Sequence, residues 1–499
     1  MLGAFLMFVL LSNASGTPQL NIGNGGQFGS FYPPDNDLEE YCYRLDEDPY
    51  IYFGTKTSYD SLTKRGGQQH IVPGCQPVQF WSINRHGTRL PKMAKIQKLR
   101  KLLDLKDEIV KNYEERKTYP NVGKLCFDDY NLLRRWRWND SITEDRAASL
   151  TQQGVNELKL LARRYKTKFP QLFNYPYNDQ NYYFQYTQTD RTHDSYQAYI
   201  EGLFDQEYYR VHANTYGNDM LLKAYRNCPE WHEKNDNNPT RNMEYNKFLQ
   251  SDEYQRLARQ VFRRLGFKYD MNDTLIQDIY DMCRFGKAWQ LDQPSAWCIA
   301  FTKEHLRLLE FGEDLKEYYA TGHGNDLVKN IGCAAVSDMY RKFEKTVQGY
   351  PDGNKVTALF THAATMQSVY ATMGIAKDYE SLKADSYRRH QRRMWRTSFI
   401  NPFAANLVAV LYQCQSSSQP GNSYKVMFFL NEVPIEEFLG CSVGLCDWAT
   451  VENNFQEIVE SCNVEAFCDG RSSGNQIRSK VTFLSSILVI MLSVKFLLK

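Results

Sequence analysis

Residues 78–91, VQFWSINRHGTRLP, decide the fold of this chain, because an apolar strand here runs directly into a charged turn. His86 stands in that turn between two arginines, and Gly87 permits the backbone to bend sharply after it. Burying the guanidinium groups of Arg85 and Arg89 at the end of a strand is costly unless an anion neutralises them. The stretch therefore predicts an anion site with an imidazole at its centre.

The same order of strand, charged turn and helix occurs twice more. Residues 182–188 are a predicted strand that ends shortly before Arg191. Residues 356–360 are another, which ends shortly before His362. This repetition is typical of an α/β sheet whose site lies at the carboxyl ends of the strands, so Arg191 and His362 are expected beside His86.

Other segments complete the predicted framework. Helices are expected over residues 93–117 and 152–168, and Thr151 is the expected N-cap of the second helix. Two further apolar strands are expected over residues 407–413 and 424–430.

The chain divides into six predicted parts. One of them is mostly helical and polar, which indicates a helical cap inserted into the α/β core. The parts are a signal peptide (1–16), a flexible leader (17–40), the first part of the core (41–204), the cap (205–348), the second part of the core (349–470) and a C-terminal tail (471–499).

The bulk composition is that of an ordinary globular protein. The 499 residues are 42% hydrophobic and 24% charged, and the net charge is only +2. This charge implies no nucleic-acid partner, so any phosphate site has to be a local concentration of basic groups.

Both ends of the chain carry signals of export and anchoring. Residues 1–11 are apolar and small residues follow them, which is typical of a signal peptide. Residues 481–498 form an apolar tail behind a polar spacer and the small residues 472–474, which favours a GPI-attachment signal, with a transmembrane anchor as the alternative. Acceptor tripeptides for N-glycosylation begin at Asn139 and Asn272. We expect a protein of the secretory pathway, at the cell surface or outside the cell.

The twelve cysteines fit an oxidising compartment, where an even number can pair. Cys441 and Cys446 are close enough in sequence to form a local loop. The same holds for Cys462 and Cys468, while the other pairings stay open. The GxSxG pattern at 440–444 is interpreted as part of the first loop, not as a nucleophile elbow. With no CxxC pair and no HExxH sequence, a zinc site is not expected.

Phosphoryl transfer is the chemistry that the basic residues suit. Arg85, Arg89 and Arg191 can neutralise the equatorial oxygens of a phosphoryl group, because arginine forks match phosphate oxygens. The imidazole of His86 can then take the phosphoryl group as a covalent intermediate. This arrangement requires no metal and no other cofactor.

The motifs resemble a known family. RHGTRLP, residues 85–91, is similar to the signature of the histidine acid phosphatases. The resemblance covers about residues 41–468 and implies an α/β, histidine-phosphatase-like fold, with a mostly parallel central sheet flanked by helices and an inserted helical cap. Four further segments resemble the multiple inositol polyphosphate phosphatase branch: YFGTKT (52–57), KIQKLRKL (95–102), LTQQG (150–154) and PFAANL (402–407).

The resemblance also implies a role for each matching residue. His86 is expected to be the nucleophile that becomes phosphohistidine, and His362 to donate a further hydrogen bond to the phosphate. The expected phosphate-binding residues are Arg85, Arg89, Arg191 and Lys92.

Residues near the mouth of the site are expected to hold the other phosphates of an inositol polyphosphate. The basic segment that follows RHGTRLP supplies Lys92, Lys98 and Lys101 for this purpose. Residues 322–324, GHG, resemble a segment that lines the substrate pocket in relatives.

The chain departs from this family at one position. The inositol phosphate branch carries His-Ala-Glu at the second histidine, where the Glu protonates the leaving oxygen, whereas this chain has His362-Ala363-Ala364. Loss of a general acid costs about 10²- to 10⁴-fold in rate. Glu432, Asp194 or the substrate's own protonated phosphate could replace it. The leading hypothesis is an active phosphatase, and the alternative is a catalytically impaired relative that binds polyphosphates or a partner. A more distant hypothesis is an anchored scaffold that uses only the fold.

Overall fold

Strand β2 (Cys75–Arg85), which contains the predicted apolar strand, lies in the middle of the main sheet. The computed structural model describes residues 40–45, 49–62, 69–269, 272–350, 354–415 and 422–470, all within one compact unit, Asn36–Lys499. Over these residues the main sheet has seven strands in the order β4-β5-β2-β6-β7-β8, with β9 paired to β7. The other strands are β4 (Tyr182–Tyr186), β5 (Val356–Thr361), β6 (Asn406–Gln415), β7 (Asn422–Leu430), β8 (Val433–Pro434) and β9 (Leu445–Asp447).

The α/β class is confirmed, but the sheet is mixed and not mostly parallel as expected. Strand β5 is parallel to both of its neighbours, β4 and β2. The pairs β2 with β6, β6 with β7, and β7 with β8 and β9 are antiparallel. A parallel crossover needs a dozen or more residues. Only residues 416–421 separate β6 from β7, so these two strands have to run antiparallel.

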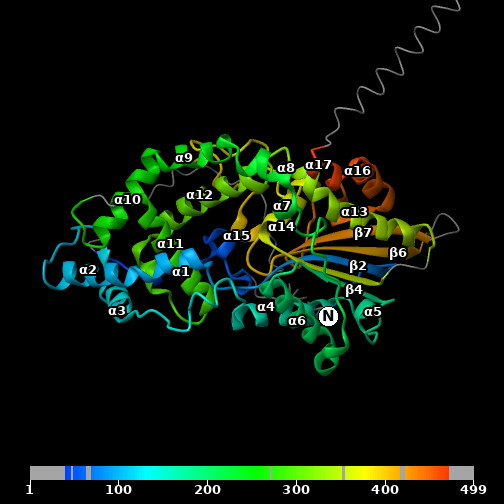
Figure 1. Cartoon of the computed structure of the whole chain (residues 1–499), viewed down its shortest axis with the longest axis horizontal. Coiled ribbons are helices and arrows are strands. Elements are labelled where there is room, and N and C mark those ends of the chain that lie inside the picture. The colour runs from blue at the N-terminus through cyan, green and yellow to red at the C-terminus, as the bar shows by residue number, and fades with distance from the viewer. Residues whose placement is uncertain are drawn as a thin grey trace, which may run out of the picture. The chain divides into compact units, whose positions relative to one another are not determined.

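Helices cover both faces of the sheet because successive side chains of each strand point to opposite sides. Phe80 packs with Tyr165 of α4 and Tyr199 of α6 on one face, whereas Trp81 belongs to the core on the other face with Met366 of α14. Figure 1 shows α4 and α6 on one side of the sheet and α13, α14 and α16 on the other. These helices are α4 (Gln152–Lys168), α5 (Pro170–Phe173), α6 (Asp190–Phe204), α13 (Val328–Val347), α14 (Ala363–Met373), α16 (Trp448–Ser461) and α17 (Val464–Cys468).

A second group of helices lies beside the sheet, on the left of the view in Figure 1. It joins helices from the predicted cap to α1, α2 and α3, which precede the cap in sequence. The predicted helix over 93–117 is divided at Lys101 into α1 and α2. The group comprises α1 (Met93–Arg100), α2 (Leu102–Glu114), α3 (Phe127–Arg135), α9 (Met243–Leu249), α10 (Asp252–Arg264), α11 (Asp273–Trp289) and α12 (Lys303–Thr321). The short helices α7 (Ala224–Asn227), α8 (Pro229–Trp231) and α15 (Thr397–Ile400) connect larger elements.

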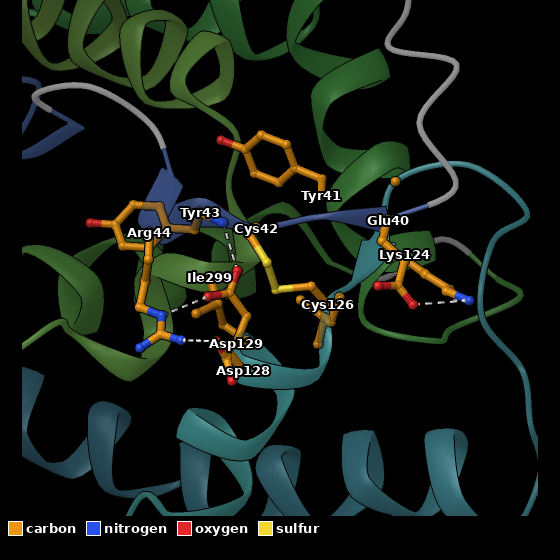
Figure 2. Close-up of a disulfide and its surroundings, with 12 residues drawn as sticks. Glu40, Tyr41, Cys42, Tyr43, Arg44, Lys124, Cys126, Asp128, Asp129 and Ile299 are labelled. Atoms are coloured by element: carbon orange, nitrogen blue, oxygen red, sulfur yellow. Dashed lines mark hydrogen bonds and ion pairs between the residues drawn. A yellow bond between two sulfur atoms is a disulfide. The ribbon is translucent and has the colours of Figure 1, made fainter.

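The first described segment is fastened by the disulfide Cys42–Cys126, shown in Figure 2. On one side of it, β1 (Glu40–Tyr41) pairs with β3 (Lys124–Leu125) in a two-stranded parallel sheet. On the other side, the backbone N–H of Tyr43 donates to Asp129 at 2.6 Å (Figure 2). The two cysteines lie close to the Asp129 carboxylate, but their sulfurs are bonded to each other and are not available as thiolate ligands.

All twelve cysteines are paired in six disulfides. The predicted local loop Cys441–Cys446 is present and contains the GxSxG pattern. The predicted loop Cys462–Cys468 is wrong. Because α17 packs against α8 and α13, Cys468 of α17 pairs with Cys228 beside α8, and Cys462, at the end of α16, pairs with Cys333 of α13. The long-range pairs are Cys75–Cys414, Cys228–Cys468 and Cys333–Cys462, and Cys283–Cys298 links α11 to the segment after it.

The predicted signal peptide, almost all of the leader and the C-terminal tail lie outside the described residues. Within the described part of the chain, no helix has the length and apolar character needed to cross a bilayer. Asn139 and Asn272 are both exposed. The division into core and cap stays a prediction.

Peptide mapping without reduction tests the revised disulfide pairing. Cleavage after Glu465 separates Cys462 from Cys468, so each is expected in a different cross-linked peptide, one joined to Cys333 and the other to Cys228. The loop Cys441–Cys446 is the internal control, because it stays within one short segment. Recovery of a peptide pair joining Cys462 to Cys468 would contradict the structure.

Candidate active site

The turn after β2 is shaped by the first turn of α4. A Cβ atom at Gly87 would lie 2.5 Å from the carbonyl oxygen of Gly154, so the two backbones can approach only because both residues are glycines. The backbone N–H and the hydroxyl of Thr151 each donate to the Thr88 carbonyl at 2.9 Å. The Thr151 hydroxyl also accepts from the N–H of Gly154, as expected of an N-cap. The LTQQG segment therefore fixes the backbone beside His86.

Glu157, one turn further along α4, secures the same turn. Its fully buried carboxylate accepts from the backbone N–H and the hydroxyl of Thr88, both at 2.8 Å, and from the hydroxyl of Ser58 at 2.8 Å. Burial raises the pKa of Glu157 to about 7. This carboxyl group therefore holds the turn in place.

Arg85 is held by carbonyl oxygens. Its Nη1 donates to the carbonyls of Thr55 at 2.8 Å and Asn401 at 2.7 Å, and its guanidinium lies over the ring of Phe403, 4.7 Å from the centroid. Among the described residues its buried Nε has no hydrogen-bond partner. Burial, and then the neighbouring Arg89, lower the pKa of Arg85 to about 9. The YFGTKT and PFAANL segments thus meet at this side chain and hold it without an ion pair to a carboxylate of the described residues.

His86 presents a neutral imidazole. Its Nδ1 lies 2.9 Å from the carbonyl oxygen of Gly87. Because a carbonyl only accepts, Nδ1 carries the proton and Nε2 keeps a lone pair. Burial, followed by the charges of Arg85 and Arg191, holds the pKa of His86 well below its usual range. His86 is only 3% exposed, which is the burial that favours the neutral imidazole.

Arg191 and His362 come from the other two parallel strands and meet at His86. The rings of His86 and His362 have centroids 5.5 Å apart. Arg191 Nη2 donates to His362 Nδ1 at 3.1 Å, so the other ring nitrogen, Nε2, carries the proton and donates to the hydroxyl of Thr187 at 2.9 Å. Burial, and then Arg191, lower the pKa of His362 well below its usual range. The structure therefore brings together the side chains that the three strand ends were expected to supply.

Of the remaining predicted basic residues, Arg89 and Lys92 lie within the electrostatic field of the cluster, whereas Lys98 and Lys101 are exposed on or just after α1. Burial, and then Arg191, lower the pKa of Arg89 to about 10. Burial, followed by Arg89 and Arg191, also lowers the pKa of the exposed Lys92, which places its ammonium group within the field of the cluster. Lys98 and Lys101 are exposed on α1 and at its C-terminal end.

Two helices begin at the cluster. Arg191 is in the first turn of α6, and His362 is the residue before α14. Neither helix has a side-chain cap, so the N–H groups of both first turns and the positive ends of both helix dipoles favour an anion here. Arg191 Nε, like Arg85 Nε, is buried without a partner among the described residues. The cluster has the composition of a site for a tetrahedral oxyanion.

A cavity of about 290 Å³ adjoins the cluster, and Ala364 forms part of its wall. Tyr225 of α7 lines it with its ring centroid 6.3 Å from that of His362. Arg226 lines the cavity as well. Burial lowers the pKa of the nearby Lys223, and the positive charges of Arg191 and Arg226 lower it further. Sequence reasoning missed these three residues, because the segment around α7 carries no motif and only the fold brings it to the strand ends.

Three predicted residues make their contacts outside the basic cluster. Glu432 accepts from Arg164 Nε at 2.8 Å and from the hydroxyl of Tyr59 at 2.8 Å, and Asp194 lies 3.2 Å from His193 Nδ1 on the surface of α6. His323 lies against Trp395 and 2.9 Å from the Ile375 carbonyl oxygen, while the preceding residues Ala320 and Thr321 reach the cavity. Neither proposed substitute carboxylate contacts the cluster.

Comparison with known proteins agrees with this geometry. The sequence pattern of the histidine phosphatase superfamily (branch 2) matches residues 79–431. The chain belongs to this superfamily. This histidine phosphatase is 36% identical over 433 residues to multiple inositol polyphosphate phosphatase 1 of Drosophila melanogaster, covering 86% of this chain and 90% of the relative. It is 27% identical to the human protein of the same name, covering 84% of this chain and 88% of that one.

Solved structures share the fold. The phytase from D. castellii matches with a TM-score of 0.64 at 18% identity, covering 85% of this chain and 87% of the other. The Bifidobacterium longum multiple inositol polyphosphate phosphatase, in complex with inositol hexasulfate, matches with a TM-score of 0.58 at 14% identity, covering 80% of this chain and 96% of the other.

The contact between the turn and α4 can be tested by Gly87→Ala. The added methyl group has to displace the backbone at Gly154, so we expect a free energy of unfolding lower by about 1–3 kcal/mol and weaker binding of inorganic phosphate. Urea unfolding and isothermal titration calorimetry measure the two effects. Gly217→Ala is the matched control, since a Cβ there meets nothing within 4 Å. If Gly87→Ala and Gly217→Ala have equal stability and equal affinity for phosphate, the close approach of Gly87 to Gly154 is not what fixes the turn.

Proposed function

We propose that this protein is a phosphomonoester hydrolase that acts on inositol polyphosphates through a phosphohistidine at His86, without a metal. The observation that carries the proposal is the neutral, lone-pair-bearing Nε2 of His86 among Arg85, Arg89 and Arg191. Relatives named multiple inositol polyphosphate phosphatase support the substrate class. The complex of the B. longum enzyme with inositol hexasulfate supports it as well.

The first step is attack of His86 Nε2 on phosphorus. The guanidinium groups of Arg85, Arg89 and Arg191 bind the phosphoryl oxygens and neutralise the charge that they carry in the transition state. Carbonyl oxygens hold Arg85 and the neutral His362 holds Arg191, and no carboxylate of the described residues makes an ion pair with either guanidinium group. When the phosphate takes Arg191 away from the ring, the His362 proton moves to Nδ1 and that nitrogen donates to the phosphate, while Nε2 accepts from the hydroxyl of Thr187. Lys92 stands beside the same group.

The substrate's other phosphates are held by basic groups outside this cluster. Lys223 and Arg226 are near Arg191, and Arg226 lines the cavity beside Ala364. Residues 205–348, which supply both side chains, act in this proposal as the cap over the site. Lys98 of the basic helix α1 and Lys101, at the C-terminal end of that helix, add positive charge at the mouth.

The alternative, a relative impaired in catalysis, rests on Ala364 alone. A protein that only binds polyphosphates does not need a neutral nucleophile in the middle of its anion site. The relatives lend no support to loss of activity in this family, and we therefore favour the enzyme.

An assay on two substrates tests the proposal. The purified protein is expected to hydrolyse both phytate and p-nitrophenyl phosphate, and His86→Ala is expected to reduce both rates to background because it removes the nucleophile. The exposed His212 offers the control substitution, His212→Ala, which keeps both activities. If the unaltered protein binds phytate but hydrolyses neither substrate, the alternative of a catalytically impaired relative that only binds polyphosphates is correct.

We further propose export and attachment to the cell surface through a GPI anchor. Six disulfides fit an oxidising compartment, and the small residues 472–474 before the apolar tail fit a GPI signal. Phosphatidylinositol-specific phospholipase C is expected to release the protein from intact expressing cells, as measured by blotting of the medium. Retention on cells after this treatment, with release only by detergent, would indicate a transmembrane tail.

A further inference from the structure

The space beside Ala364 is where the leaving oxygen needs a proton. Ala364 is the second residue of α14, follows His362 by two positions and lines the cavity beside the phosphate cluster. Its side chain is a single methyl group, and the cavity of about 290 Å³ opens there, with Tyr225 on another wall. When one phosphate of an inositol polyphosphate lies on His86 and the arginines, the inositol ring extends into this space.

Two carboxylates line that cavity, Asp236 and Glu317. Asp236 already binds two side chains that also line the cavity, since His232 Nδ1 and Arg241 Nη1 each lie 2.5 Å from its carboxylate oxygens. Glu317 is partly buried on α12 and, among the described residues, makes no hydrogen bond and no ion pair. Of the two carboxylates, Glu317 is therefore the one whose oxygens are available to a ligand in this cavity.

The surroundings hold Glu317 close to the cluster. One turn after it, the hydroxyl of Thr321 donates to Gln367 Oε1 at 2.5 Å and joins the end of α12 to α14. The charge of Glu317 partly opposes the lowering of the pKa of Arg85 by burial and by Arg89, which shows that the carboxylate is within electrostatic reach of the site. One turn earlier on α12, Glu313 is committed to ion pairs with Lys56 and Arg284 at 3.2 and 3.0 Å.

We propose that Glu317 is the proton donor of this enzyme and acts across the gap left by Ala364. The inference rests on the proposed function and names the residue that completes it. The protein has not lost its general acid; the acid has moved from the start of α14 to the facing helix α12.

The proton balance of the reaction is complete with this assignment. As His86 Nε2 bonds to phosphorus, the bond from phosphorus to the ring oxygen breaks, and that oxygen takes the proton of the Glu317 carboxylic acid. The products of this step are the free alcohol, phosphohistidine and the Glu317 carboxylate. Water then attacks phosphorus, gives its proton to Glu317, and releases phosphate and neutral His86.

Glu317→Gln tests the role. It is expected to reduce the rate of phytate hydrolysis by about 10²- to 10⁴-fold, because an inositol alkoxide leaves poorly without a proton. Hydrolysis of p-nitrophenyl phosphate, whose phenolate leaves unaided, is expected to change only a few-fold, and this activity also reports that the variant is folded. Glu304→Gln, at the exposed start of α12, is the matched control and keeps both activities.

A second variant, Ala364→Glu, separates the possible outcomes. Combined with Glu317→Gln it is expected to restore phytate hydrolysis, and by itself it is expected to add little to an enzyme that already has its acid. Full phytate activity of Glu317→Gln, or a sharp gain from Ala364→Glu alone, overturns the inference. If the unaltered protein hydrolyses neither substrate, the proposed function itself fails, which is a distinguishable result.

Discussion

The contact between the turn after β2 and the start of α4 is the constraint on which the rest of the site depends. Gly87 and Gly154 approach so closely that neither position has room for a Cβ atom. Thr151 and Glu157 then bind Thr88 from two successive turns of the helix. Any displacement of this turn would move the imidazole of His86 relative to Arg191 and His362, which follow other strands.

The second constraint is charge that the protein itself does not neutralise. Elsewhere in the molecule buried arginines are paired with carboxylates, as Arg393 is with Glu310 and Asp314. At the site, Arg85 is held by carbonyl oxygens and Arg191 by a neutral histidine. Neutral acceptors orient a guanidinium group without cancelling its charge, so the attraction for a phosphoryl group is retained. Burial, together with the same charges, lowers the pKa of both histidines, and a neutral imidazole is the state that a nucleophile requires.

The position of Ala364 beside helix α12 changes how its lack of a carboxylate is interpreted. In the linear sequence it is a missing acid, because the family position for that group is occupied by a methyl. In three dimensions it is one wall of a cavity that Glu317 also lines. A proton donor acts through its distance to the leaving oxygen, not through its place in the chain, so the acid can be supplied from α12.

The sequence alone determined the elements that carry local signals. The apolar run before RHGTRLP, the N-cap at Thr151 and the strand–turn–helix pattern around His362 depend on contacts within a few residues, and each was predicted close to its observed limits. The tertiary structure alone decided the mixed direction of the sheet, the partners of Cys462 and Cys468, and the approach of Glu317 to the site. These features depend on packing between segments more than a hundred residues apart or on the path of the connections, and such contacts leave no periodicity or motif in the chain.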